Sequence, residues 1–264
     1  MKKSAIIITV LLSLLLVSCA GGEKSDLTSI NDYIAPSYTE KIATGTLTFA
    51  ENVGDTAIIT DYVGLYTDHE VTVPEKIADR EVTVIGKEAF YFCTSATKIN
   101  LPATVTKIED FAFAGCTSLE TITIPATVTS IGKGAFNACT SLKTVIFEGE
   151  AVVSIGDFAF NDCSSLETIN IPEGVKSIGN GAFKDCKALQ SFKAPETLET
   201  IGGLSFDGCE ALNTDGALTL TASITSIGDF AFATINKEYI IAPEGSYAAE
   251  YVEAMKATEE TEAE

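Results

Sequence analysis

The chain has 264 residues with 17 basic and 37 acidic side chains, a formal net charge of −20, seven Cys, one His and no Trp. This acidity disfavours nucleic-acid binding, because polyphosphate is repelled and few cations are present to displace its counterions. A single histidine, His69, excludes metal sites with two histidines, and the chain lacks Cys-x-x-Cys, phosphate-loop, EF-hand and Gly-x-Ser-x-Gly motifs, so we expect no enzymatic activity and no cofactor.

Residues 1–18 are predicted to be a signal peptide. Lys2-Lys3 precedes an apolar run over residues 5–17, which is too short for a membrane span of about 20 residues. The following sequence, Leu16-Val17-Ser18-Cys19-Ala20, resembles the bacterial lipobox, in which a small residue precedes a Cys that is acylated and becomes the new N-terminus. The resemblance implies lipidation of Cys19. An ordinary signal peptide cut elsewhere is the alternative.

Residues 19–45 are predicted to form the lipidated Cys and a flexible tether, since residues 21–44 show no apolar periodicity. Several acyl chains on Cys19 would hold the protein stably on a membrane, whereas one chain binds only marginally. Ala20 rather than Asp follows Cys19, which by resemblance to a bacterial sorting rule disfavours retention at the inner membrane. We therefore expect an exported protein, lipid-anchored to the bacterial envelope at the outer membrane or cell surface.

Residues 82–235 contain seven copies of a unit of about 23 residues. Each copy has an Ile, usually followed by Gly, and then an Ala-Phe or Ser-Phe pair. The phenylalanines of these pairs are Phe90, Phe113, Phe136, Phe160, Phe183, Phe206 and Phe232. A unit this short cannot bury its own apolar face, so the copies must stack and share one core. The phenylalanines are predicted to fill that core rather than to form a stacking platform for sugars or bases.

The period and the strand-like segment of each unit favour the leucine-rich-repeat class over helical repeats of about 33 residues or more. The predicted fold is an α/β solenoid: a right-handed leucine-rich-repeat stack of about seven 23-residue units with short strands joined by turns or short helices. The Gly after each Ile is predicted to allow a tight turn with positive φ.

The pattern Ile-Gly-x-x-Ala-Phe-x-x-Cys-x-x-Leu-x-x-Ile-x-Ile-Pro, which residues 131–172 follow closely, resembles that of the BspA-like leucine-rich-repeat surface proteins of bacteria. The resemblance covers about residues 46–251. It implies a β-rich N-terminal cap over residues 46–81 and, after the repeats, a C-terminal cap with an acidic tail over residues 236–264. A repeat stack needs such caps because its end units otherwise expose the core.

Six Cys occupy the same position in successive repeats: Cys93, Cys116, Cys139, Cys163, Cys186 and Cys209. Stacking would align them in a column at intervals of about 4.8 Å. We predict a ladder of buried thiols, because Ile235 takes the same position in the seventh repeat and can only fill space. Disulfides between neighbouring repeats are the alternative, since this spacing lies within the range that disulfides allow.

Outward strand positions are predicted to form a binding surface, because they can vary without disturbing the core. The alternative is that these side chains are only solvated. Three extra residues in the last repeat, Thr214-Asp215-Gly216, form a turn-like insertion that either contributes to binding or is neutral. The candidate surface residues are Glu120, Thr121, Thr123, Lys143, Thr144, Glu167, Thr168, Asn170, Gln190, Ser191, Lys193 and Asp215.

The predicted function is protein–protein binding from the cell envelope. By resemblance to the BspA-like proteins, the partner is a host extracellular-matrix or plasma protein, another bacterium, or an envelope component. The acidity of the chain favours a basic or neutral partner. The alternative is a structural or envelope-maintenance lipoprotein without a host ligand.

Overall fold

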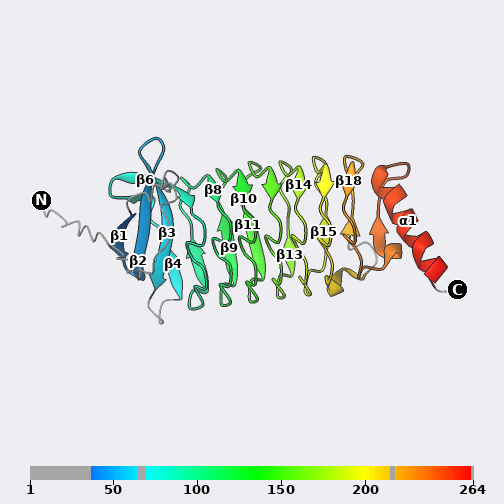
Figure 1. Cartoon of the computed structure of the whole chain (residues 1–264), viewed down its shortest axis with the longest axis horizontal. Coiled ribbons are helices and arrows are strands. Elements are labelled where there is room, and N and C mark those ends of the chain that lie inside the picture. The colour runs from blue at the N-terminus through cyan, green and yellow to red at the C-terminus, as the bar shows by residue number, and fades with distance from the viewer. Residues whose placement is uncertain (1–36, 65–68, 215–217, 263–264) are drawn as a thin grey trace, which may run out of the picture.

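The repeats stack side by side into an elongated solenoid, which confirms the fold expected from the 23-residue period (Figure 1). The structure is a computed structural model that describes residues 37–64, 69–214 and 218–262. An antiparallel sheet lies at the N-terminal end of the stack and a helix at the C-terminal end (Figure 1). The predicted lipidation site Cys19 and the residue Asp215 lie outside the described residues.

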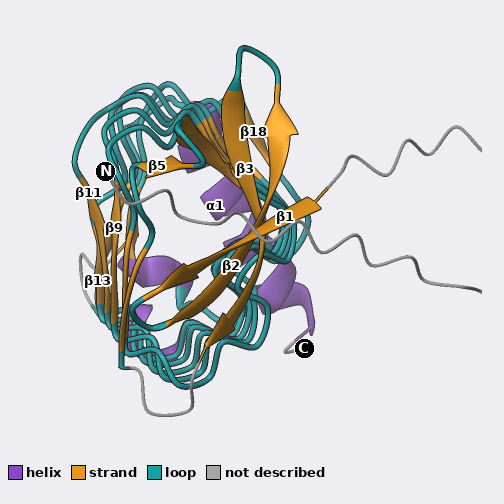
Figure 2. Cartoon of the chain, turned by 90° about the vertical axis from the view of Figure 1, so that its left-hand side faces the viewer, coloured by secondary structure: helices purple, strands orange, loops and turns teal. Residues whose placement is uncertain are grey.

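Two ladders of parallel strands run along the solenoid on opposite sides of the core (Figure 2). In the first ladder each repeat contributes a strand that ends at the Ile of the repeat motif, and Ile pairs with Ile of the next repeat. Its strands are β6 (Arg80–Ile85), β8 (Lys107–Ile108), β10 (Ser130–Ile131), β12 (Ser154–Ile155), β14 (Ser177–Ile178), β16 (Thr200–Ile201) and β18 (Ser226–Ile227). These seven rungs match the seven predicted repeats. β3 (Thr56–Gly64) pairs in parallel with β6 and adds one more strand to this ladder.

The second ladder is divided into two sheets. The first sheet contains β4 (Glu70–Thr72), β7 (Lys98–Asn100), β9 (Thr121–Ile124), β11 (Thr144–Phe147) and β13 (Thr168–Ile169). The second contains β15 (Phe192–Lys193), β17 (Leu218–Thr219) and β19 (Ile240–Ile241). The break coincides with Phe192, which takes a core position filled by Ile or Val in earlier repeats and packs its ring 4.6 Å from Phe206. Turns and two short 3-10 helices, η1 (Glu210–Leu212) and η2 (Lys237–Tyr239), complete the described repeats.

The N-terminal sheet begins earlier than the sequence predicts. β1 (Ser37–Ile42) lies within the segment 19–45 that we expected to be a flexible tether, so this expectation is wrong for residues 37–42. β1 pairs antiparallel with β2 (Gly45–Asn52) along its whole length, and β2 pairs antiparallel with β3. The ring of Tyr38 stacks 5.4 Å from that of Phe49, so the strand has an apolar contact despite containing few apolar residues. β5 (Lys76–Ile77) pairs with β6 beside this sheet.

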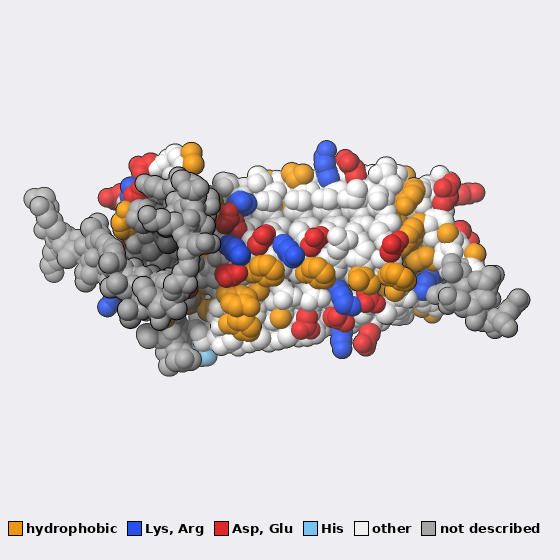
Figure 3. Space-filling view, viewed as in Figure 1, with side chains coloured by type: hydrophobic (Ala, Val, Ile, Leu, Met, Phe, Trp, Pro, Cys, Tyr) orange, Lys and Arg blue, Asp and Glu red, His pale blue; other side chains and the backbone are white. Residues whose placement is uncertain are grey.

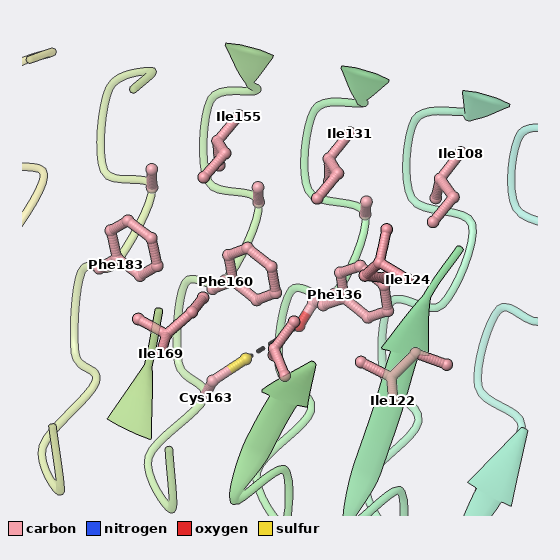
Figure 4. Packing of buried hydrophobic residues seen from close by; sticks show 14 of the residues in the cluster. Ile108, Ile122, Ile124, Ile131, Phe136, Ile155, Phe160, Cys163, Ile169 and Phe183 are labelled. Atoms are coloured by element: carbon pink, nitrogen blue, oxygen red, sulfur yellow. Dashed lines mark hydrogen bonds between the residues drawn. The ribbon is translucent and has the colours of Figure 1, made fainter. Parts of the chain in front are cut away.

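The repeat phenylalanines form a continuous column of stacked rings in the core. Neighbouring centroids lie 5.1 Å apart for Phe113 and Phe136, 5.2 Å for Phe136 and Phe160, and 5.5 Å for Phe160 and Phe183. Figure 4 shows this column beside the Ile column of the first ladder. Tyr62 from β3 packs against the N-terminal ring of the column at a tilt of 33°, and Tyr251 meets its C-terminal ring edge-on, so each cap ends the column with an aromatic side chain.

The Gly after each Ile does not adopt positive φ, contrary to our expectation. It is required by close approach instead: a Cβ on Gly132 would lie 2.6 Å from the backbone nitrogen of Asp110, and one on Gly156 would lie 2.6 Å from the carbonyl carbon of Gly132. Positive φ occurs two residues later, immediately before the Ala or Ser of each pair. We call this the left-handed position; its residues are Glu88, Phe111, Gly134, Phe158, Gly181, Leu204 and Phe230, with φ of 56–60°.

A helix, α1 (Tyr247–Glu262), covers the C-terminal end of the stack (Figure 1). The hydroxyl of Ser246 accepts a hydrogen bond from the Ala249 amide at 3.2 Å, which caps the first turn. Ala248 and Val252 are buried, and the Tyr251 hydroxyl donates to the Gly228 carbonyl at 3.0 Å. The helical backbone continues into the segment expected as an acidic tail. Within the described ranges, no helix is long and apolar enough to cross a membrane.

Candidate functional site

The sequence-predicted surface residues that the structure describes lie along the second ladder, and none of them is buried. The threonines are brought together: Thr144 is the register partner of both Thr121 and Thr168 on neighbouring strands. Ser191 and Lys193 are separated from this column by the break before β15. The predicted columns are therefore continuous over the middle repeats but not over the full length of the solenoid.

Charges on this face are mostly paired. Lys143 Nζ lies 3.2 Å from Glu120 Oε2, and Lys98 Nζ lies 3.1 Å from Glu70 Oε1. Hydrogen bonds from Asn100 and then Lys98 lower the pKa of Glu70 below its usual value. Such exposed pairs contribute little to stability, because water screens them. Lys193 forms no ion pair with any described residue, and it lines a small depression of about 130 Å³ beside Asn170 and Ser191.

Two features of the opposite face were missed by the sequence prediction. The first is a shallow groove of about 570 Å³ along the first ladder. It is lined by the hydroxyl residues Ser154, Ser177, Thr200 and Ser226 and by the glycines that follow the Ile residues. The recurring Ser-Ile-Gly or Thr-Ile-Gly triplet would have revealed this groove.

The second missed feature is a row of apolar side chains at the left-handed position. It consists of Phe111, Phe158, Leu204 and Phe230, and we call it the apolar row. Figure 3 shows hydrophobic side chains in a band along this face of the solenoid. Bulky residues seldom adopt positive φ, so their recurrence at one repeat position is unusual. The signal was a Phe two residues before a core phenylalanine, which we did not separate from the core pattern.

The six repeat cysteines form the expected column and are free thiols in the structure. Five are buried; Cys93, in the first repeat, is partly exposed. The Sγ of Cys163 donates to the Phe136 carbonyl at 3.2 Å (Figure 4), and the other four buried thiols donate in the same way to a repeat phenylalanine carbonyl. Burial raises the pKa of Cys163 and Cys186 well above the usual value and that of Cys209 to about 12.

We predict that all six thiols are reduced in the folded protein. Titration with a thiol reagent in denaturant, without reductant, should detect six free thiols in a chain whose Cys19 is acylated or has been removed. In native protein the five buried thiols should be protected, because burial shields them from the reagent and suppresses thiolate formation. Cys93 is more accessible, but its hydrogen bond with Cys116 and its partial burial also raise its pKa, so it too should react more slowly than an unfolded thiol. Two or fewer free thiols after denaturation would instead indicate disulfides between neighbouring repeats.

The raised thiol pKa values also predict how stability depends on pH. An unfolded thiol has a pKa of roughly 8.5, and the buried thiols titrate at higher pH. Their contribution is therefore complete below about pH 8.5 and decreases as the pH rises above that value, because the unfolded chain then loses protons more readily.

The described part of the chain contains no group of three or more His, Cys, Asp or Glu side chains that could hold a metal ion. The groove and the depression are open surface features, and we assign no cofactor to either of them.

The chain matches the family model described as BspA type leucine rich repeat region, in six copies, over residues 83–213 and 176–251. Among solved structures, a leucine rich repeat protein from T. pallidum is 33% identical, with a TM-score of 0.63, and the match covers 69% of this chain and 83% of that chain. A leucine-rich repeat protein from Eubacterium ventriosum is 29% identical (TM-score 0.60, 70% of this chain, 49% of that chain). One from Bacteroides ovatus is 25% identical (TM-score 0.51, 80% and 68%). The search of curated proteins finds no match.

Proposed function

The chain belongs to the BspA-type leucine-rich-repeat family, and on that basis we propose that it is an exported, lipid-anchored protein of the bacterial envelope that binds other proteins through its solenoid surface. Leucine-rich-repeat folds are typically non-enzymatic scaffolds, and proteins of this class generally bind proteins. The chain spans about half the length of the Eubacterium ventriosum protein, so the activity of a longer relative is not transferred to it.

The main support for this proposal is the regular arrangement of outward-facing side chains along the second ladder. In the second ladder, strands β9, β11 and β13 hold Thr121, Thr144 and Thr168 in register, with the paired charges of Glu120 and Lys143 beside them. The apolar residues that alternate with them on the same strands are buried in the core. An extended surface of this kind suits a macromolecular partner, whereas a small molecule would require a larger concave pocket than the depression of about 130 Å³ beside Lys193.

The location rests on the sequence of the N-terminal segment. The signal peptide and the lipobox-like sequence at Cys19 support export and acylation, and Ala20 supports transfer beyond the inner membrane. We propose that the exported protein uses its solenoid surface to adhere to host or other bacterial macromolecules. A structural envelope lipoprotein without a host ligand is the alternative.

Protease treatment of intact cells distinguishes these functions. An adhesin displayed outward should be degraded, whereas a protein that faces the periplasm should be spared while the outer membrane is intact. Permeabilised cells provide the control, because protease then reaches both populations. Full protection in intact cells together with degradation in permeabilised cells would contradict the adhesin proposal.

We expect arginine substitutions on the second ladder to block partner binding. The double variant T144R/T168R places two bulky cations in the middle of the threonine column, so affinity for a basic or neutral protein captured from host matrix or envelope extract should fall at least about tenfold. T200R is the matched control, because Thr200 occupies an outward strand position on the first ladder. Dissociation constants from surface plasmon resonance test this. Loss of binding in T200R alone would assign binding to the opposite face.

A further inference from the structure

Three members of the apolar row are exposed at a repeat position where the fold requires no side chain, and the fourth, Phe111, is half-buried. Phe158, Leu204 and Phe230 are 37%, 39% and 67% exposed. Gly134 and Gly181 occupy the same left-handed position in other repeats with the same φ, so the turn can form without any side chain there. The ring of Phe158 lies over Gly181, since a Cβ on that glycine would be 2.5 Å from Phe158 Cε1. Phe230, in the last repeat, is the most exposed member of the row.

Acidic groups flank the apolar row in the C-terminal repeats. Asp157 and Asp229 immediately precede Phe158 and Phe230 in the sequence. On the other side of the row, Lys184 is paired with Asp207 and lies 3.7 Å from Asp185. Figure 3 shows acidic side chains on both sides of the hydrophobic band. Over the whole row, from residue 109 to residue 230 of these turns, carboxylates outnumber ammonium groups. The carboxylates are Glu109, Asp110, Asp157, Asp162, Asp185, Asp207, Glu210 and Asp229, and the ammonium groups are Lys133, Lys184 and Lys187.

The spacing of the row matches that of an amphipathic helix. Phe111, Phe158 and Leu204 lie two repeats apart, which corresponds to about 10 Å at a strand spacing of about 4.8 Å. Apolar residues one heptad apart on a helix are separated by about 10.5 Å. From Phe111 to Phe230 the row extends over five repeat steps, or about 24 Å, which a helix of about 16 residues would cover.

We infer that the apolar row docks a cationic amphipathic helix of a partner protein, with the apolar stripe of the helix on the row and its basic residues against the flanking carboxylates. The acidic charge disfavours the main competitors, because a second copy of this chain would bring a like-charged face and an anionic bilayer would be repelled. The inference rests on the proposed function as a protein-binding scaffold and adds a surface and a partner class to it.

The test measures binding of a dye-labelled synthetic peptide to the full chain by fluorescence anisotropy. The probe is a helix of about 18 residues with Leu at the heptad a and d positions and Lys elsewhere. A scrambled peptide of the same composition has the same charge but no apolar stripe, and a second control replaces Lys with Glu. The wild-type chain should bind the Lys–Leu helix at least about tenfold more tightly than either control, and binding should weaken with added salt.

The variant F158G/F230G should lower affinity for the Lys–Leu helix at least about tenfold without loss of fold, because Gly already occupies this position in two repeats. I146T is the matched control, since Ile146 is 46% exposed on the second ladder, and its affinity should stay unchanged. Thermal unfolding followed by circular dichroism verifies that both variants are folded.

Unchanged affinity in a folded F158G/F230G variant would overturn the inference, as would equal binding of the scrambled peptide. Concentration-dependent dimerisation of the wild-type chain that is lost in F158G/F230G would also overturn it, in favour of a self-interface. These outcomes are independent of the proposed function, because protease accessibility on cells and the T144R/T168R variant do not involve the apolar row.

Discussion

Replacing Phe160 with Ala is expected to destabilise the protein by about 3–5 kcal/mol, the range observed when a fully buried Phe is truncated. The Phe160 side chain is completely buried and stacks between the rings of Phe136 and Phe183 at 5.2 and 5.5 Å. The substitution leaves a cavity in the middle of the ring column and interrupts contacts on both sides. Urea unfolding followed by circular dichroism measures the change in the free energy of unfolding.

The defect should also reduce the cooperativity of unfolding. Each repeat contacts only its neighbours, so weakening one interface lets the two halves of a solenoid unfold separately. F232A should be milder, because the last ring has one stacked neighbour, Phe206, and meets Tyr251 only edge-on at 6.3 Å. Equal losses for F160A and F232A would show that the column does not act as a nearest-neighbour stack.

Phe158 provides the matched control for Phe160 within the same turn. It is exposed and has φ of 56°, a conformation that costs a non-glycine residue roughly 1–2 kcal/mol. F158G relieves this strain but removes the ring contact over Gly181. We expect the two effects nearly to cancel, so stability should change by less than about 1 kcal/mol, in contrast to F160A. Two phenylalanines two residues apart thus differ because only one of them is in the core.

The core was predictable because its positions repeat without interruption. Phe occurs at the same place in all seven units, and Cys or Ile fills the column beside it, so the period alone indicates which side chains face inward. The outward direction of Thr121, Thr144 and Thr168 follows from the two-residue alternation of strands. These features depend on local periodicity, which a single sequence displays directly.

The left-handed position was not predictable in this way, because its residue type changes from repeat to repeat. Gly134 and Gly181 alternate with Phe111 and Phe158, so neither glycine nor an apolar residue marks it consistently. We predicted positive φ for the Gly after Ile because it recurs in the repeats. Its actual cause is the close approach of the backbones of neighbouring repeats, which leaves no room for a Cβ. Contacts between repeats, rather than preferences within one repeat, decide both positions.

The strand β1 and the division of the second ladder were missed for a related reason. β1 depends on pairing with β2 and on the contact between Tyr38 and Phe49, neither of which its own short sequence reveals. The break before β15 accompanies a single substitution, Phe192 for a smaller core residue. In both cases the structure is determined by a contact between residues in different segments of the chain, which the local sequence does not reveal.

Replacing Cys19 with Ala is expected to abolish stable membrane association. Acylation requires the thiol of the residue that follows the lipobox-like Leu16-Val17-Ser18, and Ala cannot accept an acyl chain. Each methylene group of a buried acyl chain contributes about 0.8 kcal/mol to membrane binding, so the loss of several chains removes essentially all of the anchoring energy. Fractionation of cells and incorporation of labelled palmitate measure the effect: C19A should shift to the soluble fraction and carry no label.

C93A is the matched control, because Cys93 is the partly exposed member of the thiol ladder and lies in the repeats. It should remain in the membrane fraction and incorporate palmitate like the wild-type chain. If C19A keeps both the label and membrane association, the chain is acylated elsewhere and the lipobox interpretation is wrong. If C19A and the wild-type chain are both unlabelled and soluble, the segment acts as an ordinary signal peptide, and any surface display then has to come from binding to another envelope component.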